Sequence, residues 1–313
     1  MNLSTTQMTK CAGDSPVECL MRRLIDYAGL FPPASLRMAA ALANYTEYTR
    51  SEYSWALGRL IVPAARLIEF EEALSTLSVT QADPLSWELS VLLGPDSGAD
   101  LDRIYQFNVR RRSLNPGVNA VIESVEAKAA SPDEVRRLDA LIPRDLPAYF
   151  ELPLTERLHE SVAAVEGCFG RRLKIRMGGE TADKFPSPEA VAEFLRLCVS
   201  AELPFKATAG LHHPVRSVQR LTYEPDSPTA MMHGFLNVFL AAAFLRNGME
   251  LARAVEVLKE ESGSAFRFDA QGVSWREHQL SGRDLFLARD FAASFGSCSF
   301  SEPIDDLRVL HLL

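Results

Sequence analysis

Short apolar segments alternate with longer amphipathic segments along most of the chain. The short segments are rich in residues that favour strands, and the longer ones carry apolar residues at helical spacing. Two helix starts are well marked, because Ser131 and Ser187 are each followed by a proline and an acidic residue. The pattern predicts strands over residues 24–30, 59–63, 87–93, 118–124, 148–152, 173–177, 204–210 and 266–269.

Helical patterns fill the intervals between these strands. The first strand is the weakest prediction, because its residues also fit the end of a helix that begins at Pro16. The predicted helices cover residues 35–49, a segment around 67–71, 100–110, a segment from 131, 155–168, 187–201, 231–261 with a break at 247–248, and 282–293.

Eight strand–helix units in succession indicate a parallel sheet. No Gly-x-Gly-x-x-Gly turn follows the first strand, so the pattern favours a (β/α)8 TIM barrel over a dinucleotide-binding doubly wound sheet. No linker divides the chain. The sequence therefore predicts a single α/β domain over residues 1–313, with a helical N-terminal extension (1–20) and a C-terminal tail (294–313).

Composition narrows the class of protein. The chain of 313 residues is 47% hydrophobic, which excludes a disordered or fibrous protein. Its net charge of −8 argues against a nucleic-acid partner. The first sixteen residues lack an apolar signal core, and the longest apolar run, 234–245, is shorter than the about 20 residues that span a bilayer. We expect a cytoplasmic protein with a small-molecule substrate and no membrane partner, and homo-oligomer formation is left open.

The five cysteines form no Cys-x-x-Cys pair, which argues against a structural zinc site or a disulfide framework. Buried or incidental thiols are the more common explanation. Cys298, in a segment rich in small residues, is one further candidate nucleophile.

Charged residues interrupt three consecutive strands. Glu151 lies in the fifth strand, Lys174 and Arg176 share one face of the sixth, and Lys206 and Thr208 share one face of the seventh. Unpaired charges in strands that are buried on both faces are costly, so the barrel interior is the favourable place for them. Alternatives remain: Glu151 and one lysine could form a structural ion pair, or Lys174 could face solvent at the start of its strand.

These residue types are those that Schiff-base chemistry needs. A lysine amine in an apolar, cationic neighbourhood loses its proton more readily and attacks carbonyl carbons. A nearby carboxylate then carries protons while the iminium forms and a carbon–carbon bond breaks.

The segments from Leu173 to Gly179 and from Phe205 to Leu211 resemble strands six and seven of the deoxyribose-phosphate aldolases. That resemblance implies a class I aldolase mechanism, in which Lys174 forms the Schiff base and Lys206 tunes it. Glu151 resembles a Glu at the end of strand five in that family.

The resemblance is limited to residues 149–211, and two features differ from the family. An Asp serves there as a proton shuttle earlier in the barrel, where this chain offers Glu123 and Glu126. The family also has a phosphate-binding Gly-rich turn where this chain has Leu211-His212-His213-Pro214.

Other residues near the predicted strand ends are candidates for substrate binding. His212 could act as an acid or base, and the alternative is a divalent metal held by Glu151 with histidines and an acid. Glycines let a backbone approach a ligand closely, and Arg176 would supply a counter-charge to an anion. The substrate-binding candidates are Arg176, Gly178, Gly179, Thr208, Gly210, His213, Glu123 and Asp269, and the additional metal-ligand candidate is His233.

The sequence thus predicts a lyase or aldolase that acts on a small carbonyl compound, phosphorylated or carboxylated, without a cofactor. Lys174, Lys206, Glu151 and His212 are the predicted catalytic residues. Two alternatives stay open: a metal-dependent lyase or isomerase that uses Glu151 with His212 and His213, and a non-catalytic barrel that binds an anionic metabolite.

Overall fold

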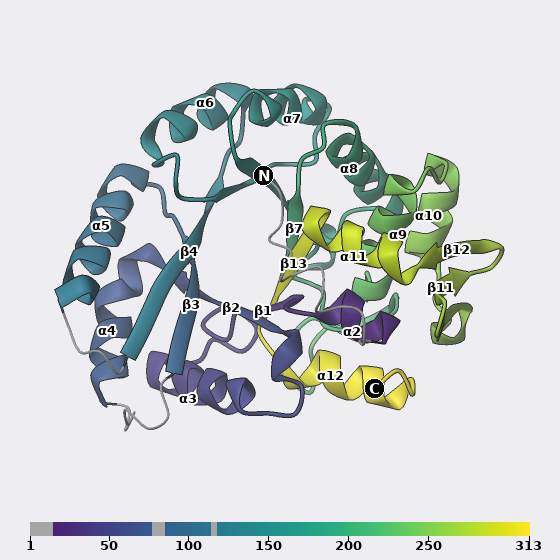
Figure 1. Ribbon diagram of the computed structural model, residues 1–313, viewed down its shortest axis with the longest axis horizontal. Helices are drawn as coiled ribbons and strands as arrows, with labels where there is room; N and C mark the ends of the chain where they lie inside the picture. The colour runs from purple at the N-terminus through teal and green to yellow at the C-terminus, as the bar shows by residue number, and fades with distance from the viewer. Residues whose placement is uncertain (1–14, 77–84, 114–117) are drawn as a thin grey trace.

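The computed structural model describes residues 15–76, 85–113 and 118–313. Its centre is a closed barrel of eight parallel strands surrounded by helices (Figure 1). The predicted (β/α)8 barrel is confirmed. In order around the barrel the strands are β1 (Ile25–Tyr27), β2 (Leu57–Pro63), β3 (Leu85–Leu92), β4 (Val118–Lys128), β5 (Ala148–Glu151), β6 (Arg171–Arg176), β7 (Phe205–Thr208) and β13 (Ala292–Ser297).

Each of the first six connections between successive barrel strands is a simple helical crossover. Two of the helices, α6 and α8, begin where the Ser-Pro signals place them, with the Ser side chains accepting from backbone N–H groups. The connecting helices are α3 (Met38–Thr49), α4 (Leu67–Thr76), α5 (Ser97–Ser113), α6 (Pro132–Leu141), α7 (Leu158–Glu166) and α8 (Pro188–Ser200), and α2 (Pro16–Met21) precedes β1.

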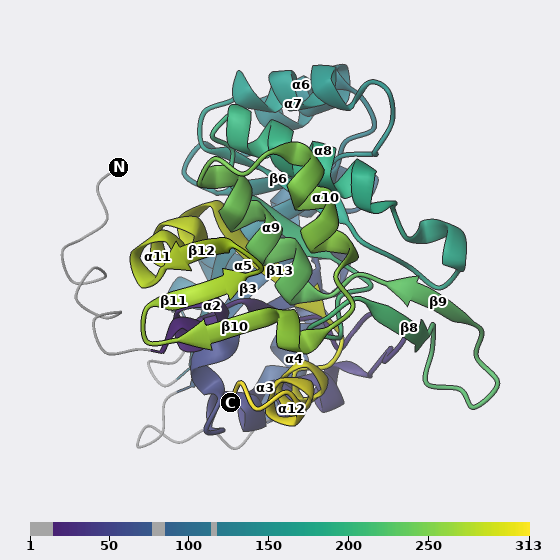
Figure 2. The same cartoon turned by 90° about the vertical axis from the view of Figure 1, so that its right-hand side faces the viewer.

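The seventh connection is much longer and contains two additional sheets. A hairpin, β8 (Ser217–Arg220) and β9 (Thr229–Met232), projects from the C-terminal ends of the strands (Figure 2). Helices α9 (Phe235–Arg246) and α10 (Leu251–Lys259) follow, with the predicted break between them. An antiparallel sheet of β10 (Phe266–Asp269), β11 (Gly272–Trp275) and β12 (His278–Ser281) then leads into α11 (Gly282–Phe291).

The prediction of the eighth barrel strand at residues 266–269 is wrong. Those residues form β10, where alternating apolar and polar side chains suit a strand with one solvated face. The eighth strand is β13, which pairs with β1 and β7, and α12 (Ser301–Val309) follows it. The segment expected as a tail therefore contains the end of a barrel strand and the helix that follows it. Residues 1–14 of the expected N-terminal extension lie outside the described residues.

Strand β13 joins the barrel to its helical layer through one aromatic side chain. Phe295 points outward and stacks on Phe235 of α9, with the ring centroids 5.2 Å apart. Helix α9 is buried from Phe235 to Leu245, which explains why its sequence is apolar on every side. On the inner face of β13, Ser294 and Gly296 point into the barrel. Small inner residues leave room for longer side chains from the opposite strands.

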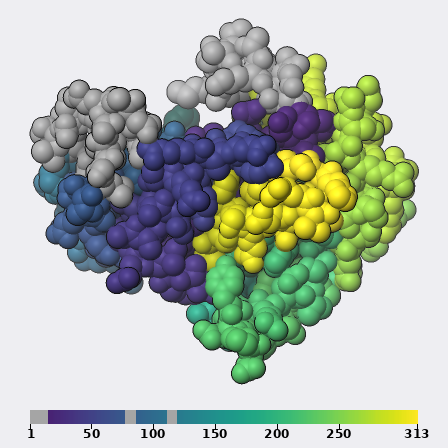
Figure 3. All heavy atoms as spheres, turned by 90° about the horizontal axis from the view of Figure 1, so that it is seen from below, coloured from purple at the N-terminus to yellow at the C-terminus, as the bar shows by residue number. Residues whose placement is uncertain are grey.

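Helix α12 covers one side of the C-terminal end of the barrel. Figure 3 shows the C-terminal segment (yellow) seated between the N-terminal part of the chain (purple and blue) and the segment that carries the β8–β9 hairpin (green). Within the described residues, no helix combines the length and apolar character needed to cross a membrane.

Candidate active site inside the barrel

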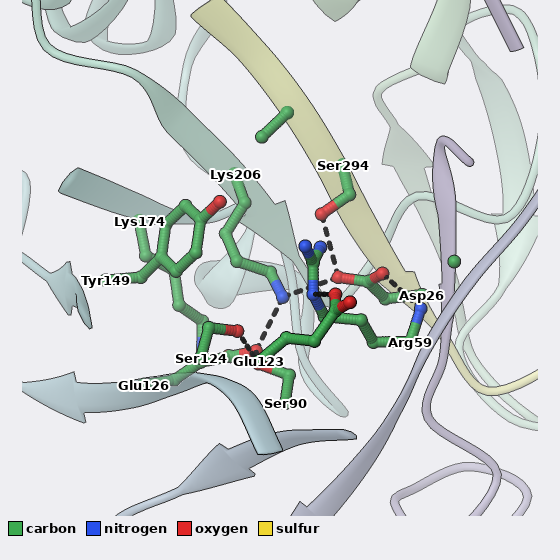
Figure 4. A network of polar contacts seen from close by, with 12 residues as sticks. Asp26, Arg59, Ser90, Glu123, Ser124, Glu126, Tyr149, Lys174, Lys206 and Ser294 are labelled. Atoms are coloured by element: carbon green, nitrogen blue, oxygen red, sulfur yellow. Dashed lines mark hydrogen bonds and ion pairs between the residues drawn. The ribbon is translucent and has the colours of Figure 1, made fainter. Parts of the chain in front are cut away.

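A row of alternating charges crosses the barrel interior. At one end, the Lys206 ammonium donates hydrogen bonds to Asp26 Oδ2 at 2.7 Å and to Glu126 Oε1 at 2.5 Å (Figure 4). Lys206 and Asp26 are fully buried and Glu126 is 1% exposed. The structure therefore places Lys206 between two carboxylates, at the bottom of the site.

The row continues on the other side of Glu126. Lys174 Nζ lies 2.8 Å from Glu126 Oε2 and 2.8 Å from Glu151 Oε2. Arg176 Nε completes the row at 2.9 Å from Glu151 Oε1. Three cations thus alternate with three carboxylates, and the row as a whole is neutral.

The two lysines are bound differently. Lys206 makes hydrogen bonds to both of its acids and is also surrounded by Ser294 and the Tyr149 ring. Glu126 Oε2 and Glu151 Oε2, the oxygens that face Lys174, have no hydrogen-bond partner other than Lys174 among the described residues. Each of these oxygens therefore pairs with the Lys174 amine alone.

Strand register explains why these side chains meet. Lys174 on β6 pairs with Lys206 on β7 and with Glu151 on β5, so the three side chains lie at the same height. Lys206 lies beside Ser294 on β13. The alternation of strand residues then points all of them inward.

Two hydroxyl groups and one backbone N–H add hydrogen bonds to the two buried acids. Ser294 Oγ donates to Asp26 Oδ2 at 2.7 Å, and the Arg59 backbone N–H donates to Asp26 Oδ1 at 2.8 Å. Ser90 Oγ donates to Glu126 Oε1 at 2.6 Å. The face of the Tyr149 ring lies 5.3 Å from Lys206 Nζ, which adds a cation–π contact.

The ion pairs outweigh burial in setting the protonation of the row. Burial alone would lower the pKa of Lys206, but Asp26 and Glu126 raise it above its usual value. Burial alone would raise the pKa of Asp26 and of Glu126, but the neighbouring cations hold both pKa values below their usual range. These cations are Lys206 and Arg59 at Asp26, and Lys174 followed by Lys206 at Glu126. The pKa of Glu151 is likewise lowered, mainly by Lys174 and Arg176 against the effect of burial. Lys206 therefore stays an ammonium at neutral pH.

A cavity of about 810 Å³ opens above this row at the C-terminal ends of the strands. Glu126, Lys174, Glu151 and Arg176 are among its lining residues, whereas Lys206 is not among the described residues that line it. Of the two lysines in the row, Lys174 is thus the one that a ligand in the cavity can reach. Further lining residues come from the loop after β7, the β8–β9 hairpin and α12: His212, His213, Arg220, Tyr223 and Glu302.

The structure brings most of the predicted site residues to this cavity. The catalytic candidates Lys174, Glu151 and His212 line it, and Lys206 lies directly beneath. Gly178 lies behind the wall, where a Cβ atom would lie 2.5 Å from the Phe185 ring. The substrate-binding candidates that line the cavity are Arg176, Gly179, Thr208, Gly210 and His213.

Two predicted substrate-binding residues lie elsewhere. Glu123 forms ion pairs with Arg59 at 2.8 Å and with Arg23, which precedes β1, and is not among the residues that line the cavity. Glu123 has no partner on β3, because the register of the β3–β4 pairing shifts between Leu89 and Ser90. Glu126, further along β4, is the acid that reaches the site. Asp269 is exposed on β10, outside the barrel, where it accepts a hydrogen bond from the Gln271 backbone.

The histidines are held by acids of α12. Nδ1 of His212 lies 2.9 Å from Glu302 Oε2, and Nδ1 of His213 lies 2.6 Å from Asp306 Oδ2. Nε2 of His233 lies 2.7 Å from the Pro186 carbonyl oxygen. The described part of the chain contains no cluster of three or more His, Cys, Asp or Glu side chains arranged to hold a metal ion.

Asp26 was not predicted from the sequence as a site residue or as a partner in an ion pair. The signal was present, because an acid between Ile25 and Tyr27 in a predicted buried strand is the same cue that singled out Glu151. The α12 acids had no such signal, since they lie in a segment predicted as a tail.

No protein-family model matches the chain, and neither a curated protein nor a solved structure matches it.

Proposed function

We propose that the protein is a lyase of the class I aldolase type, which cleaves or forms a carbon–carbon bond of a small carbonyl compound through a Schiff base on Lys174. The observation that carries this proposal is the position of the Lys174 amine, at the floor of a cavity and between two carboxylate oxygens that have no other hydrogen-bond partner among the described residues. The resemblance of β6 and β7 to the deoxyribose-phosphate aldolases agrees with it.

The first step is addition of the amine to the carbonyl. A proton passes from Lys174 to Glu126 or Glu151, each 2.8 Å away, and the free electron pair on nitrogen attacks the carbonyl carbon. The carbonyl π electrons move to oxygen, which leaves as water once it has gained two protons, and a protonated imine remains.

The iminium carries the same positive charge as the ammonium that it replaces. The two carboxylates that pair with Lys174 therefore stabilise the iminium in the same place. Breaking the carbon–carbon bond then moves its electron pair into the iminium and neutralises it, while the hydroxyl on the departing carbon loses its proton to Glu126 or Glu151. The products are an enamine on Lys174 and a released carbonyl fragment. Lys206 remains an ammonium beside Glu126, so Glu126 is a weak base and readily gives up the proton that it receives.

The cavity also favours an anionic substituent on the substrate. Lys128 and Arg220 line the cavity, and both are exposed. Cations of this kind suit a phosphate or carboxylate group.

The test is reduction with borohydride in the presence of a panel of small aldehydes and ketones, followed by peptide mass spectrometry. We expect one adduct on Lys174. Lys174→Arg keeps the charge of the row but should form no adduct, and Lys259→Met, on an exposed residue of α10, is the matched control and should behave as the wild type. An adduct on Lys206 in place of Lys174, or none with any carbonyl compound, would refute the proposal; the latter would favour a barrel that binds an anion without catalysis.

A further inference from the structure

A cysteine, a histidine and a glutamate meet at a second place in the same cavity. Cys298 follows β13, and its Sγ lies 3.9 Å from Nε2 of His212. The other ring nitrogen of His212 bonds to Glu302 on α12, at 2.9 Å. The Tyr223 hydroxyl lies 3.5 Å from the same Sγ and 3.4 Å from Glu302 Oε2. All four residues line the cavity.

This cluster is brought together by segments far apart in the sequence. His212 lies in the loop after β7, Tyr223 lies in the connection between β8 and β9, and Glu302 lies in the first turn of α12. A nucleophile, a base beside it and an acid that orients the base are the arrangement of an activated nucleophile. Neither the charged row nor the proposed Schiff-base chemistry uses this cluster.

Electrostatics in the cluster favour a thiolate–imidazolium pair. Burial would raise the pKa of Cys298, but the hydrogen bond from His212 and its positive charge lower it. Burial would lower the pKa of His212, but Cys298 and Glu302 raise it to about 9. The remaining titratable groups that face the pair are Tyr223, Tyr27 at the end of β1, and His213, which acts on Glu302.

The thiol is distant from the Lys174 amine. Lys174 pairs with Lys206, which pairs with Ser294, and Cys298 lies four residues further along the chain. At the rise of a strand, that separation is about 13 Å along the strand direction. Lys174 thus lies at the floor of the cavity and Cys298 nearer its opening.

We propose that Cys298 is a nucleophile that adds reversibly to an aldehyde bound near the opening of the cavity, with His212 as the proton donor. The thiolate sulfur forms a bond to the carbonyl carbon, the π electrons move to the carbonyl oxygen, and that oxygen takes the proton of the His212 imidazolium. The product is a hemithioacetal and a neutral His212, and reversal restores both. Glu302 is a positioning residue, which holds the His212 ring through Nδ1.

This proposal goes beyond the Schiff-base function and does not depend on it. Its test uses the full chain with Cys11→Ser as the background, because Cys11 lies outside the described residues. Alkylation by iodoacetamide is followed for each cysteine by mass spectrometry. Cys168, a half-buried thiol whose pKa is raised by burial and by Asp139, is the internal control. We expect Cys298 to react at least about tenfold faster than Cys168 at pH 7, because only the thiolate is nucleophilic.

His212→Gln should slow the reaction of Cys298 about tenfold and move its pH profile to higher pH, and Glu302→Gln should do so to a smaller degree. His278→Gln, on β12 and outside the cavity, should change neither. Propionaldehyde should protect Cys298 but not Cys168 from alkylation, also in a Lys174→Arg background that forms no imine. The proposal is overturned if Cys298 reacts no faster than Cys168, if His212→Gln leaves the pH profile unchanged, or if the aldehyde gives no protection.

Discussion

Replacing Lys206 by methionine tests the electrostatic account of the charged row. The change removes the cation 2.7 Å from Asp26 and 2.5 Å from Glu126 and leaves both acids buried. At an effective dielectric constant near 20, one charge pair at 2.7 Å is worth about 6 kcal/mol. Asp26 keeps its hydrogen bonds from Ser294 and from the Arg59 backbone, which offset part of the loss. We therefore expect Lys206→Met to lower the free energy of unfolding by about 3–5 kcal/mol at pH 7.

The dependence on pH separates this cause from simple loss of packing. In the wild type the folded-state pKa of Asp26 is lowered, so its contribution to stability is present above the unfolded pKa near 3.8 and is lost as pH falls through the folded value. In Lys206→Met the main cation is gone, and burial should raise the pKa of Asp26 above 3.8. The buried carboxylate then opposes folding at neutral pH, and this penalty disappears on acidification. The difference in stability between wild type and variant should shrink from pH 7 to pH 4.5.

Urea unfolding followed by circular dichroism at pH 7, 5.5 and 4.5 measures this difference. The control is Lys206→Met combined with Asp26→Asn, which removes both charges and should recover at least about half of the lost free energy, because breaking a buried pair costs more than removing it. A loss below about 1 kcal/mol, a difference that does not change with pH, or no recovery in the double variant would refute the reasoning.

Three further changes test the cavity and its supports. Gly210→Ala should destabilise the protein and reduce ligand binding, because φ is +68° and the new Cβ would lie 2.9 Å from the Gly178 Cα. Its control is Gly248→Ala, where φ is +89° and nothing lies within 4 Å of the new Cβ. That change should cost only the backbone strain of about 1 kcal/mol in thermal unfolding. The raised pKa of His212 predicts a contribution to stability that is complete below pH 6.5 and is lost as pH rises through about 9, so wild type and His212→Gln should converge in unfolding free energy between pH 7 and pH 10. Arg171→Met should lower the free energy of unfolding by about 3–5 kcal/mol, because the buried guanidinium bonds to Asp139 and to the carbonyls of Ile142 and Leu146. Its control is Arg136→Met, at an exposed ion pair within a helix, which should change the free energy of unfolding by less than about 1 kcal/mol.

The parity of charges within strands made the centre of the site predictable. Lys174 and Arg176 lie two residues apart on a strand buried on both faces, and so do Lys206 and Thr208, so their common inward direction follows from the geometry of a strand. Which acid each lysine meets depends on register between strands. The irregularity at Leu89 and Ser90, where Glu123 has no partner on β3, is not visible in the local sequence.

The last strand was missed because a barrel strand can be built from small residues. Ala292 to Ser297 contains one large apolar side chain, Phe295, and its apolar signal is weaker than that of β10. The inner positions of β13 are small because Lys206 and Asp26 meet beside Ser294, and because the Ile61 side chain lies against Gly296. Such a requirement comes from strands far away in the sequence and cannot be read locally. The same error hid α12, and with it the acids that hold His212 and His213.

The order of charges along the row bears on which lysine reacts. Buried ion pairs are inefficient stabilisers, since apolar residues of similar volume often do as well, so a row of six charged groups is weak evidence of a purely structural purpose. Lys206 is enclosed and bonded to both of its acids, whereas Lys174 reaches the cavity and faces two oxygens that have no other hydrogen-bond partner among the described residues. Glu126 links the two, because one of its oxygens is bound by Lys206 and Ser90 while the other faces Lys174. A permanent cation behind Glu126 thus keeps that carboxylate ionised and makes it a weak base, so in the proposed mechanism it passes on any proton that it receives from Lys174. Under that proposal the two lysines, at the same height on adjacent strands, have different roles: Lys174 meets the substrate and Lys206 holds the charge of Glu126.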